Sequence, residues 1–138
     1  MENEKKKKTI MIIEDEASLL KAIRDKLYRN NFEMIAARTA NQALELLKSL
    51  EVMKNESYVD AIWLDHYLLG YEDGLDFMKK IKSNEHWKNI PVLVVSNTAS
   101  ESKVESYLKL GITKYYVKAD YRLDQIVDDI KKFLDNVK

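Results

Sequence analysis

The chain lacks cysteine, and its charges cancel. Zero cysteines among 138 residues exclude disulfide bonds, thiolate metal sites and cysteine nucleophiles, which suits a reducing compartment. The 23 lysine and arginine residues balance 23 aspartate and glutamate residues, so the net charge favours neither nucleic acid nor an anionic membrane as a partner. We therefore expect a protein that binds neither.

A long hydrophobic run is also missing. No apolar segment is long enough for a signal peptide or a membrane span, so the cytoplasm is the expected location. Linkers, internal repeats and low-complexity tracts are absent, and 46% hydrophobic residues suffice for one domain with its own core. We expect a solvated basic N-terminal arm over residues 1–8 and a single domain over residues 9–138.

Short apolar runs are typical of buried strands. Four of them cover residues 10–13, 61–64, 92–95 and 115–117. Their length and β-tolerant composition predict strands that are buried on both faces of a sheet, with Trp63 in the core. Another short strand is expected over residues 32–37.

Amphipathic helices are expected to alternate with these strands, because apolar residues recur at helical spacing. The expected inward-facing residues are Leu19, Leu20, Ile23 and Leu27; Ala40, Ala43, Leu44 and Leu47; Leu75, Met78 and Ile81; Val104, Tyr107 and Leu108; and Ile126, Val127, Ile130, Phe133 and Leu134. Thr39 and Gln42 predict a capping box, Ser100 a cap, and Gly111 a helix end. Five alternations with right-handed crossovers specify an α/β fold, a parallel sheet with helices on both faces.

Polar residues follow four of the strands. Glu14 and Asp15 follow the first strand, Asp65 the third, Ser96 the fourth and Lys118 the fifth. Ligands bind outside the carboxyl edge of such a sheet, so we expect these side chains to meet there. Three carboxylates in one place repel one another unless one is protonated or a cation joins them, and Mg²⁺ prefers such oxygen ligands.

This set of residues predicts phosphoryl transfer to Asp65. An aspartate beside Mg²⁺ is a competent nucleophile toward phosphorus. Because the transferred phosphoryl group spreads negative charge over three oxygens, the site needs positive charge and hydrogen-bond donors. Lys118 can supply the charge and the Ser96 hydroxyl a donor.

Taken together, four motifs resemble the receiver domain of bacterial two-component response regulators. The resemblance covers residues 9–137, and the order and spacing of the motifs match. The motifs are Ile-Ile-Glu14-Asp15-Glu, Trp-Leu-Asp65-His-Tyr, Val-Val-Ser96-Asn and Tyr115-Tyr-Val-Lys118. This likeness implies a flavodoxin-like, doubly wound (βα)5 sandwich with a five-stranded parallel sheet of order 2-1-3-4-5.

The resemblance also implies the roles of the site residues. Asp65 would accept a phosphoryl group from a sensor histidine kinase or a histidine phosphotransfer protein. Asp15, Asp65 and the backbone carbonyl of Tyr67 would hold Mg²⁺, and Glu14 would act through water. Lys118 would pair with a phosphoryl oxygen. Such a protein catalyses only its own phosphorylation and dephosphorylation.

A conformational switch is implied as well. Ser96 would bond another phosphoryl oxygen and move toward it, vacating space into which the Tyr115 ring can turn. The face made by the fourth helix, last strand and last helix would then bind a downstream protein, with the chain a monomer or weak homodimer.

Three departures from the family pattern concern the rates more than the fold. Ala119 follows Lys118 where receivers usually carry proline, often through a cis bond. A cis bond before a residue other than proline costs about 2.5–4 kcal/mol, and the sequence leaves open whether the bond between Lys118 and Ala119 is cis or trans. Asn97 is bulkier than the usual alanine or glycine and can obstruct a donor or an attacking water. The loop after Asp65 lacks the usual proline and is about one residue longer.

Two other functions stay open. A Mg²⁺-dependent phosphatase with an aspartyl nucleophile generally has a second acid two residues later, where this chain has Tyr67. A degenerate receiver would bind partners without being phosphorylated, and Ala119 and Asn97 keep this reading open. His66 is expected to be a loop side chain near the mouth of the site rather than a metal ligand or acid-base group.

Overall fold

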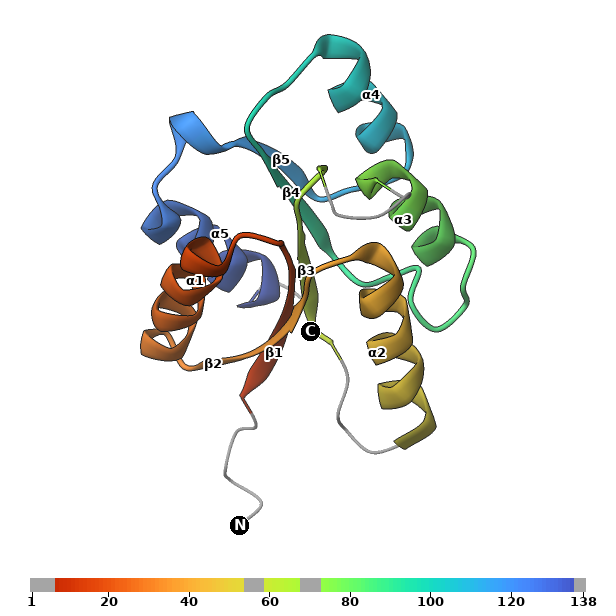
Figure 1. Ribbon diagram of the computed structural model, residues 1–138, viewed down its shortest axis with the longest axis horizontal. Coiled ribbons are helices and arrows are strands. Elements are labelled where there is room, and N and C mark those ends of the chain that lie inside the picture. The colour runs from red at the N-terminus through yellow and green to blue at the C-terminus, as the bar shows by residue number, and fades with distance from the viewer. Residues whose placement is uncertain (1–6, 54–58, 68–72, 136–138) are drawn as a thin grey trace.

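A parallel sheet forms the centre of the protein (Figure 1). The computed structural model describes residues 7–53, 59–67 and 73–135. Within these ranges the sheet has five strands in the order β2-β1-β3-β4-β5, all parallel, which confirms the expected fold class. The strands are β1 (Lys8–Ile13), β2 (Phe32–Ala37), β3 (Ala61–Leu64), β4 (Val92–Ser96) and β5 (Lys114–Val117).

Helices cover both faces of the sheet (Figure 1). One face carries α1 (Ala17–Arg29) and α5 (Leu123–Asp135), and the other carries α2 (Ala40–Met53), α3 (Gly74–Lys82) and α4 (Glu101–Lys109). A 3-10 turn, η1 (Lys118–Asp120), joins β5 to α5. No helix in the described ranges is long and apolar enough to cross a membrane.

The central strands pack against both helical layers. In β3, Ala61 and Trp63 belong to the core under α1 and α5, whereas Ile62 and Leu64 belong to the core on the opposite face. All four are buried, with Trp63 only 1% exposed. Continuous apolar runs are therefore needed here, because successive side chains of a strand point to opposite faces.

Side-chain caps fix where several helices begin. Ser100 accepts from the Lys103 backbone N–H at 3.2 Å, as expected. Asp73 and Asp76 form a capping box before α3, which the sequence reading missed. Thr39 accepts from the Gln42 N–H at 3.0 Å, but the Gln42 side chain accepts from Arg38 rather than closing the box on Thr39.

The expectation that Leu108 faces inward is wrong, because 54% of this residue is exposed. Tyr107 is fully buried and Val104 is half-buried, so α4 packs through a narrow stripe. Adjacent residues lie about 100° apart around a helix of 3.6 residues per turn, so Leu108 turns away when Tyr107 points inward.

The ends of the expected elements agree only in part. Strand β1 begins at Lys8, the last residue of the expected N-terminal arm. Gly111 follows α4 with φ of +89°, a conformation that glycine adopts without steric cost, as expected for a helix end. The expected loop over residues 54–58, most of the loop after Asp65 and the last two residues of the expected final helix lie outside the described ranges.

Candidate functional site

The pairing of β1 with β3 brings the two acidic motifs together. Ile13 pairs with Leu64, so both strands end at the same level of the sheet. The Asp65 N–H then donates to the Ile13 carbonyl at 3.1 Å, which extends the pairing one residue beyond the strands. Glu14 is held similarly, because its N–H donates to the Ala37 carbonyl of β2 at 3.0 Å.

Three carboxylates form a cluster at this edge. One oxygen each from Glu14, Asp15 and Asp65 lies within 4.8 Å of the other two. Glu14 is 2% and Asp65 6% exposed, so water screens these two charges poorly. A set of carboxylate oxygens suits a hard divalent cation, and the cluster could hold such a metal ion.

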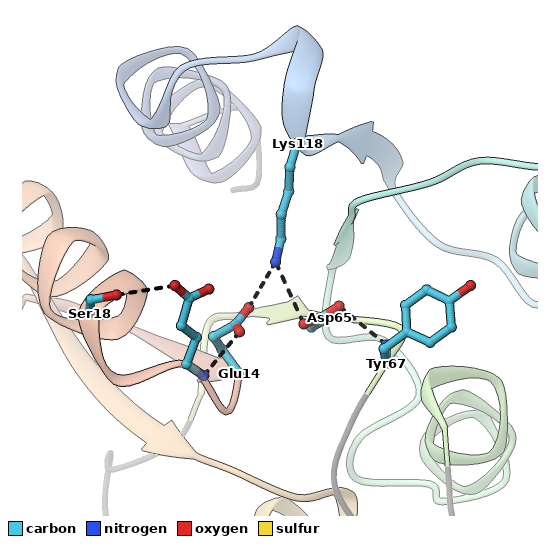
Figure 2. A network of polar contacts seen from close by, with 6 residues as sticks. Glu14, Ser18, Asp65, Tyr67 and Lys118 are labelled. Atoms are coloured by element: carbon cyan, nitrogen blue, oxygen red, sulfur yellow. Dashed lines mark hydrogen bonds and ion pairs between the residues drawn. The ribbon is translucent and has the colours of Figure 1, made fainter.

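The Lys118 side chain points at Glu14 and Asp65 and contacts both (Figure 2). Its Nζ lies 3.3 Å from Glu14 Oε1 and 3.6 Å from Asp65 Oδ2. Lys118 starts η1 immediately after β5, so the end of the fifth strand aims this ammonium at the acids of the first and third. This is the convergence that the sequence predicts.

Glu14 has a raised pKa. Burial, and secondly the negative charge of Asp65, raise the pKa of Glu14 to about 7, although Lys118 opposes the shift. Three carboxylates beside one ammonium leave surplus negative charge at the site. A bound cation would remove this surplus, so the residues present fit a divalent metal.

Ser96 places an unused hydroxyl at the end of β4. The residue is fully buried, and its Oγ has no hydrogen-bond partner among the residues that the structure describes. It lies two residues beyond Val94, which pairs with Leu64 of β3. Buried hydroxyls are usually paired, so this group is available to a ligand oxygen at the edge of the sheet.

Two tyrosines flank the site. The Tyr67 backbone N–H donates to Asp65 Oδ1 at 3.2 Å (Figure 2). Tyr67 as a whole is 55% exposed. Tyr115 is half-buried, and its hydroxyl donates to the Thr98 carbonyl at 2.6 Å. The Tyr115 ring thus already contacts the loop that follows Ser96.

The expectation that His66 lies near the mouth of the site is wrong. The residue is only 7% exposed, and its Nδ1 is hydrogen bonded to the Tyr107 hydroxyl at 2.7 Å. Burial, and secondly the positive charge of Lys103, lower the pKa of His66. Its partner lies 41 positions later in the chain, so no local pattern could have indicated the contact.

Two of the three departures from the family pattern, Asn97 and Ala119, lie in the described ranges. Asn97 is exposed. No peptide bond in the described ranges is cis, so the bond between Lys118 and Ala119, which the sequence left open, is trans.

Comparisons with known proteins agree with this geometry. DivK of Brucella ovis, a polar-differentiation response regulator, is 28% identical over 127 residues, which are 92% of this chain and 96% of that protein. The phosphorylated cyanobacterial phytochrome response regulator RcpA superposes with a TM-score of 0.81 at 28% identity, covering 96% of this chain and 97% of that one. The Mn²⁺-bound form of the response regulator Rcp1 superposes with a TM-score of 0.79 at 26% identity, covering 95% of this chain and 97% of that one.

A family model covers most of the chain. The model of the response regulator receiver domain matches residues 10–132, which include β2 to β5, the last four residues of β1 and the whole acidic cluster. Receiver domains are signalling proteins that interact with histidine kinases and downstream effectors. The match, the strand order and the relatives together show that this chain belongs to the response regulator receiver domain family.

Proposed function

We propose that this protein accepts a phosphoryl group on Asp65 from a histidine kinase or a histidine phosphotransfer protein, and signals to a protein partner. The observation that carries the proposal is the cluster at the edge of the sheet. There the Asp65 carboxylate lies 3.6 Å from the Lys118 ammonium, and one of its oxygens lies within 4.8 Å of an oxygen of Glu14 and an oxygen of Asp15. Clustered acids repel one another and so destabilise the folded protein. In a protein of this family, we therefore assign the cluster to phosphoryl transfer rather than to stabilising the fold.

Asp65 is the nucleophile in the proposed reaction. A carboxylate oxygen bonds to phosphorus while the bond from phosphorus to the donor imidazole nitrogen breaks, and that nitrogen keeps the electron pair. The Tyr67 N–H orients Asp65 by donating to Oδ1, which leaves Oδ2 beside Lys118. Lys118 neutralises one phosphoryl oxygen, and the unpaired Ser96 hydroxyl donates to another.

The proposed metal is Mg²⁺. Asp15, Asp65 and the Tyr67 carbonyl would hold it, with Glu14 acting through water, and when bound it supplies positive charge to the phosphoryl oxygens. Support comes from the oxygen-only donor set and from the raised pKa of Glu14, about 7, to which burial contributes first and the charge of Asp65 second.

The proposed output is a shift between two packings. Ser96 moves toward the phosphoryl group, and Tyr115 turns into the space that Ser96 leaves. The face formed by α4, β5 and α5 then changes its affinity for a downstream protein. Support comes from the unpaired Ser96 hydroxyl and from the contact of Tyr115 with the loop after Ser96. We propose a cytoplasmic protein that is a monomer or weak homodimer.

Intact-mass measurement with acetyl phosphate and Mg²⁺ tests the assignment of Asp65. We expect one added phosphoryl group on the wild type and on Asp120→Asn, which removes an exposed acid two residues after Lys118. Asp65→Asn is expected to stay unmodified, because an amide does not form the acyl phosphate. Addition to Asp65→Asn would overturn the site assignment.

Intact mass and a turnover assay with a phosphate ester test the two other hypotheses. An unmodified wild type would identify a degenerate receiver that binds partners without phosphorylation. Sustained turnover of a phosphate ester by the wild type, lost in Asp65→Asn, would identify a phosphatase. We expect neither result.

A further inference from the structure

The two residues that follow Asp65 both contact α4. His66 points inward, where its Nδ1 and the Tyr107 hydroxyl are hydrogen bonded at 2.7 Å. Tyr67 points outward, where its hydroxyl accepts from Lys103 Nζ at 2.9 Å. We call these four residues, His66, Tyr67, Lys103 and Tyr107, the α4 clasp.

Helix α4 contacts the loop after Asp65 at two residues. Lys103 and Tyr107 are four residues apart, so they lie on one face of the helix, about one turn from each other. The exposed half of the clasp has further contacts, since Lys103 Nζ also donates to Thr98 Oγ1 at 3.1 Å and lies 4.6 Å from the Tyr67 ring centre. Consecutive residues after Asp65 therefore hold a full turn of α4.

Gly74 leaves room for the buried half. A Cβ atom at this position would lie 2.1 Å from the Tyr107 hydroxyl and 3.2 Å from His66 Cα. Gly74 also fixes the backbone of His66, because its N–H donates to the His66 carbonyl at 3.0 Å. The first residue of α3 is therefore shaped to let the Tyr107 hydroxyl reach His66.

We propose that the α4 clasp consists of positioning residues through which the state of Asp65 sets the position of α4. The hydrogen bond between His66 and Tyr107 is buried, so leaving either partner unpaired costs free energy. Movement of His66 must therefore either carry α4 along or break this bond. This connection runs through the loop after Asp65, whereas Ser96 ends β4 and Tyr115 lies on β5. The two routes meet at Tyr107, whose ring centre lies 5.8 Å from that of Tyr115. It rests on the proposed function, because Asp65 must change its chemical state for the clasp to transmit anything.

The test compares two buried tyrosine hydroxyls. Tyr107→Phe keeps the ring but removes the clasp hydrogen bond, and Tyr116→Phe removes a hydroxyl that donates to Asp129 at 2.8 Å. Both tyrosines are fully buried, so the second variant controls for loss of a buried hydrogen bond. The readout is the change in backbone amide NMR shifts of α4 when Mg²⁺ and beryllofluoride, a phosphoryl mimic, are added.

We expect Tyr107→Phe to lose about half or more of the wild-type shift change in α4, with the changes in β1 and β3 retained. Tyr116→Phe should keep the wild-type response throughout. A wild-type response of α4 in Tyr107→Phe would overturn the proposal. Equal losses in both variants would overturn it too, because the effect would then belong to any buried hydroxyl.

The exposed half of the clasp is tested by Lys103→Met, with Lys109→Met as its control in the exposed last turn of α4. We expect only Lys103→Met to reduce the response of α4, and equal responses in the two variants would remove Lys103 and Tyr67 from the clasp. Phosphorylation itself is followed separately by intact mass. A wild type that stays unmodified refutes the proposed function, whereas modification of Tyr107→Phe with an unchanged α4 response refutes only the clasp.

Discussion

Ser96 combines full burial with a hydroxyl that has no partner among the described residues. Leaving a buried hydroxyl unpaired costs about 1–3 kcal/mol, so the resting protein loses stability to retain this group. Replacement by alanine removes the hydroxyl and leaves almost the same shape. We therefore expect Ser96→Ala to raise the free energy of unfolding by about 1 kcal/mol, measured by urea denaturation without Mg²⁺.

The same substitution should slow phosphorylation. Loss of one donor to a developing negative charge typically costs about 100-fold or more in a preorganised site, and for Ser96, one donor among several, we expect at least about tenfold. The rate of mass increase with acetyl phosphate measures this. A Ser96→Ala protein that is less stable and phosphorylated at the wild-type rate would contradict both expectations.

Single residues of the site were predictable where a general rule of the fold applies. Glu14, Asp15, Asp65 and Lys118 all follow strands, and parallel strands end at one edge, so their proximity follows from the strand pattern. His66 obeys no such rule. Its burial depends on a tyrosine from a distant helix and on the space left by a glycine, which are tertiary facts without a local signature.

At the scale of elements, β5 and α5 are joined by a small polar network. Asp129 Oδ2 accepts from the Tyr116 hydroxyl at 2.8 Å and from Lys114 Nζ at 3.2 Å. Lys114 also lies over the Tyr116 ring, 4.9 Å from its centre. Partial burial alone would raise the pKa of Asp129, but hydrogen bonds from Tyr116 and Lys114 and the charge of Lys114 hold this pKa below its usual value.

This network predicts a dependence of stability on pH. The pKa of Asp129 is lower in the folded than in the unfolded protein, so its stabilising effect is present above the unfolded value of 3.8 and is lost as the pH falls through the folded value. We expect Asp129→Asn to cost about 1 kcal/mol of unfolding free energy near about pH 6, a difference that shrinks toward about pH 3. Urea unfolding at both pH values measures it.

The neighbouring Asp128 provides the control, because it is exposed on the same helix. Asp128→Asn should change the unfolding free energy by less than about 0.5 kcal/mol. A cost of Asp129→Asn that grows as the pH falls would contradict the assignment of the lowered pKa to this network.

The elements themselves were largely predictable from hydrophobic periodicity, and the error at Leu108 has a physical origin. The apolar runs of β1, β3 and β4 are buried on both faces and cannot be mistaken for surface segments. Helix α4, at the edge of the layer, buries Tyr107 fully and leaves Leu108 exposed. Periodicity gives the angle between two side chains but not the width of the face that its neighbours cover.

At the scale of the whole molecule, the acidic cluster proposed to bind the metal lowers the stability of the protein without it. Three carboxylates meet one nearby ammonium, and burial together with the charge of Asp65 raises the pKa of Glu14 to about 7. Removing one carboxylate without changing its shape should relieve this repulsion. We expect Asp15→Asn to raise the unfolding free energy without Mg²⁺ by about 1 kcal/mol.

With Mg²⁺ bound, we expect the wild type to be more stable than Asp15→Asn. A ligand that binds only the folded protein at about 100 times its dissociation constant adds about 2.7 kcal/mol, and thermal unfolding with and without Mg²⁺ measures the gain. We expect this gain in the wild type and in Asp25→Asn, which removes an exposed acid of α1, but not in Asp15→Asn. Since repulsion and metal binding come from the same carboxylates, a variant that gained stability without the metal yet kept the full response to Mg²⁺ would place the metal elsewhere.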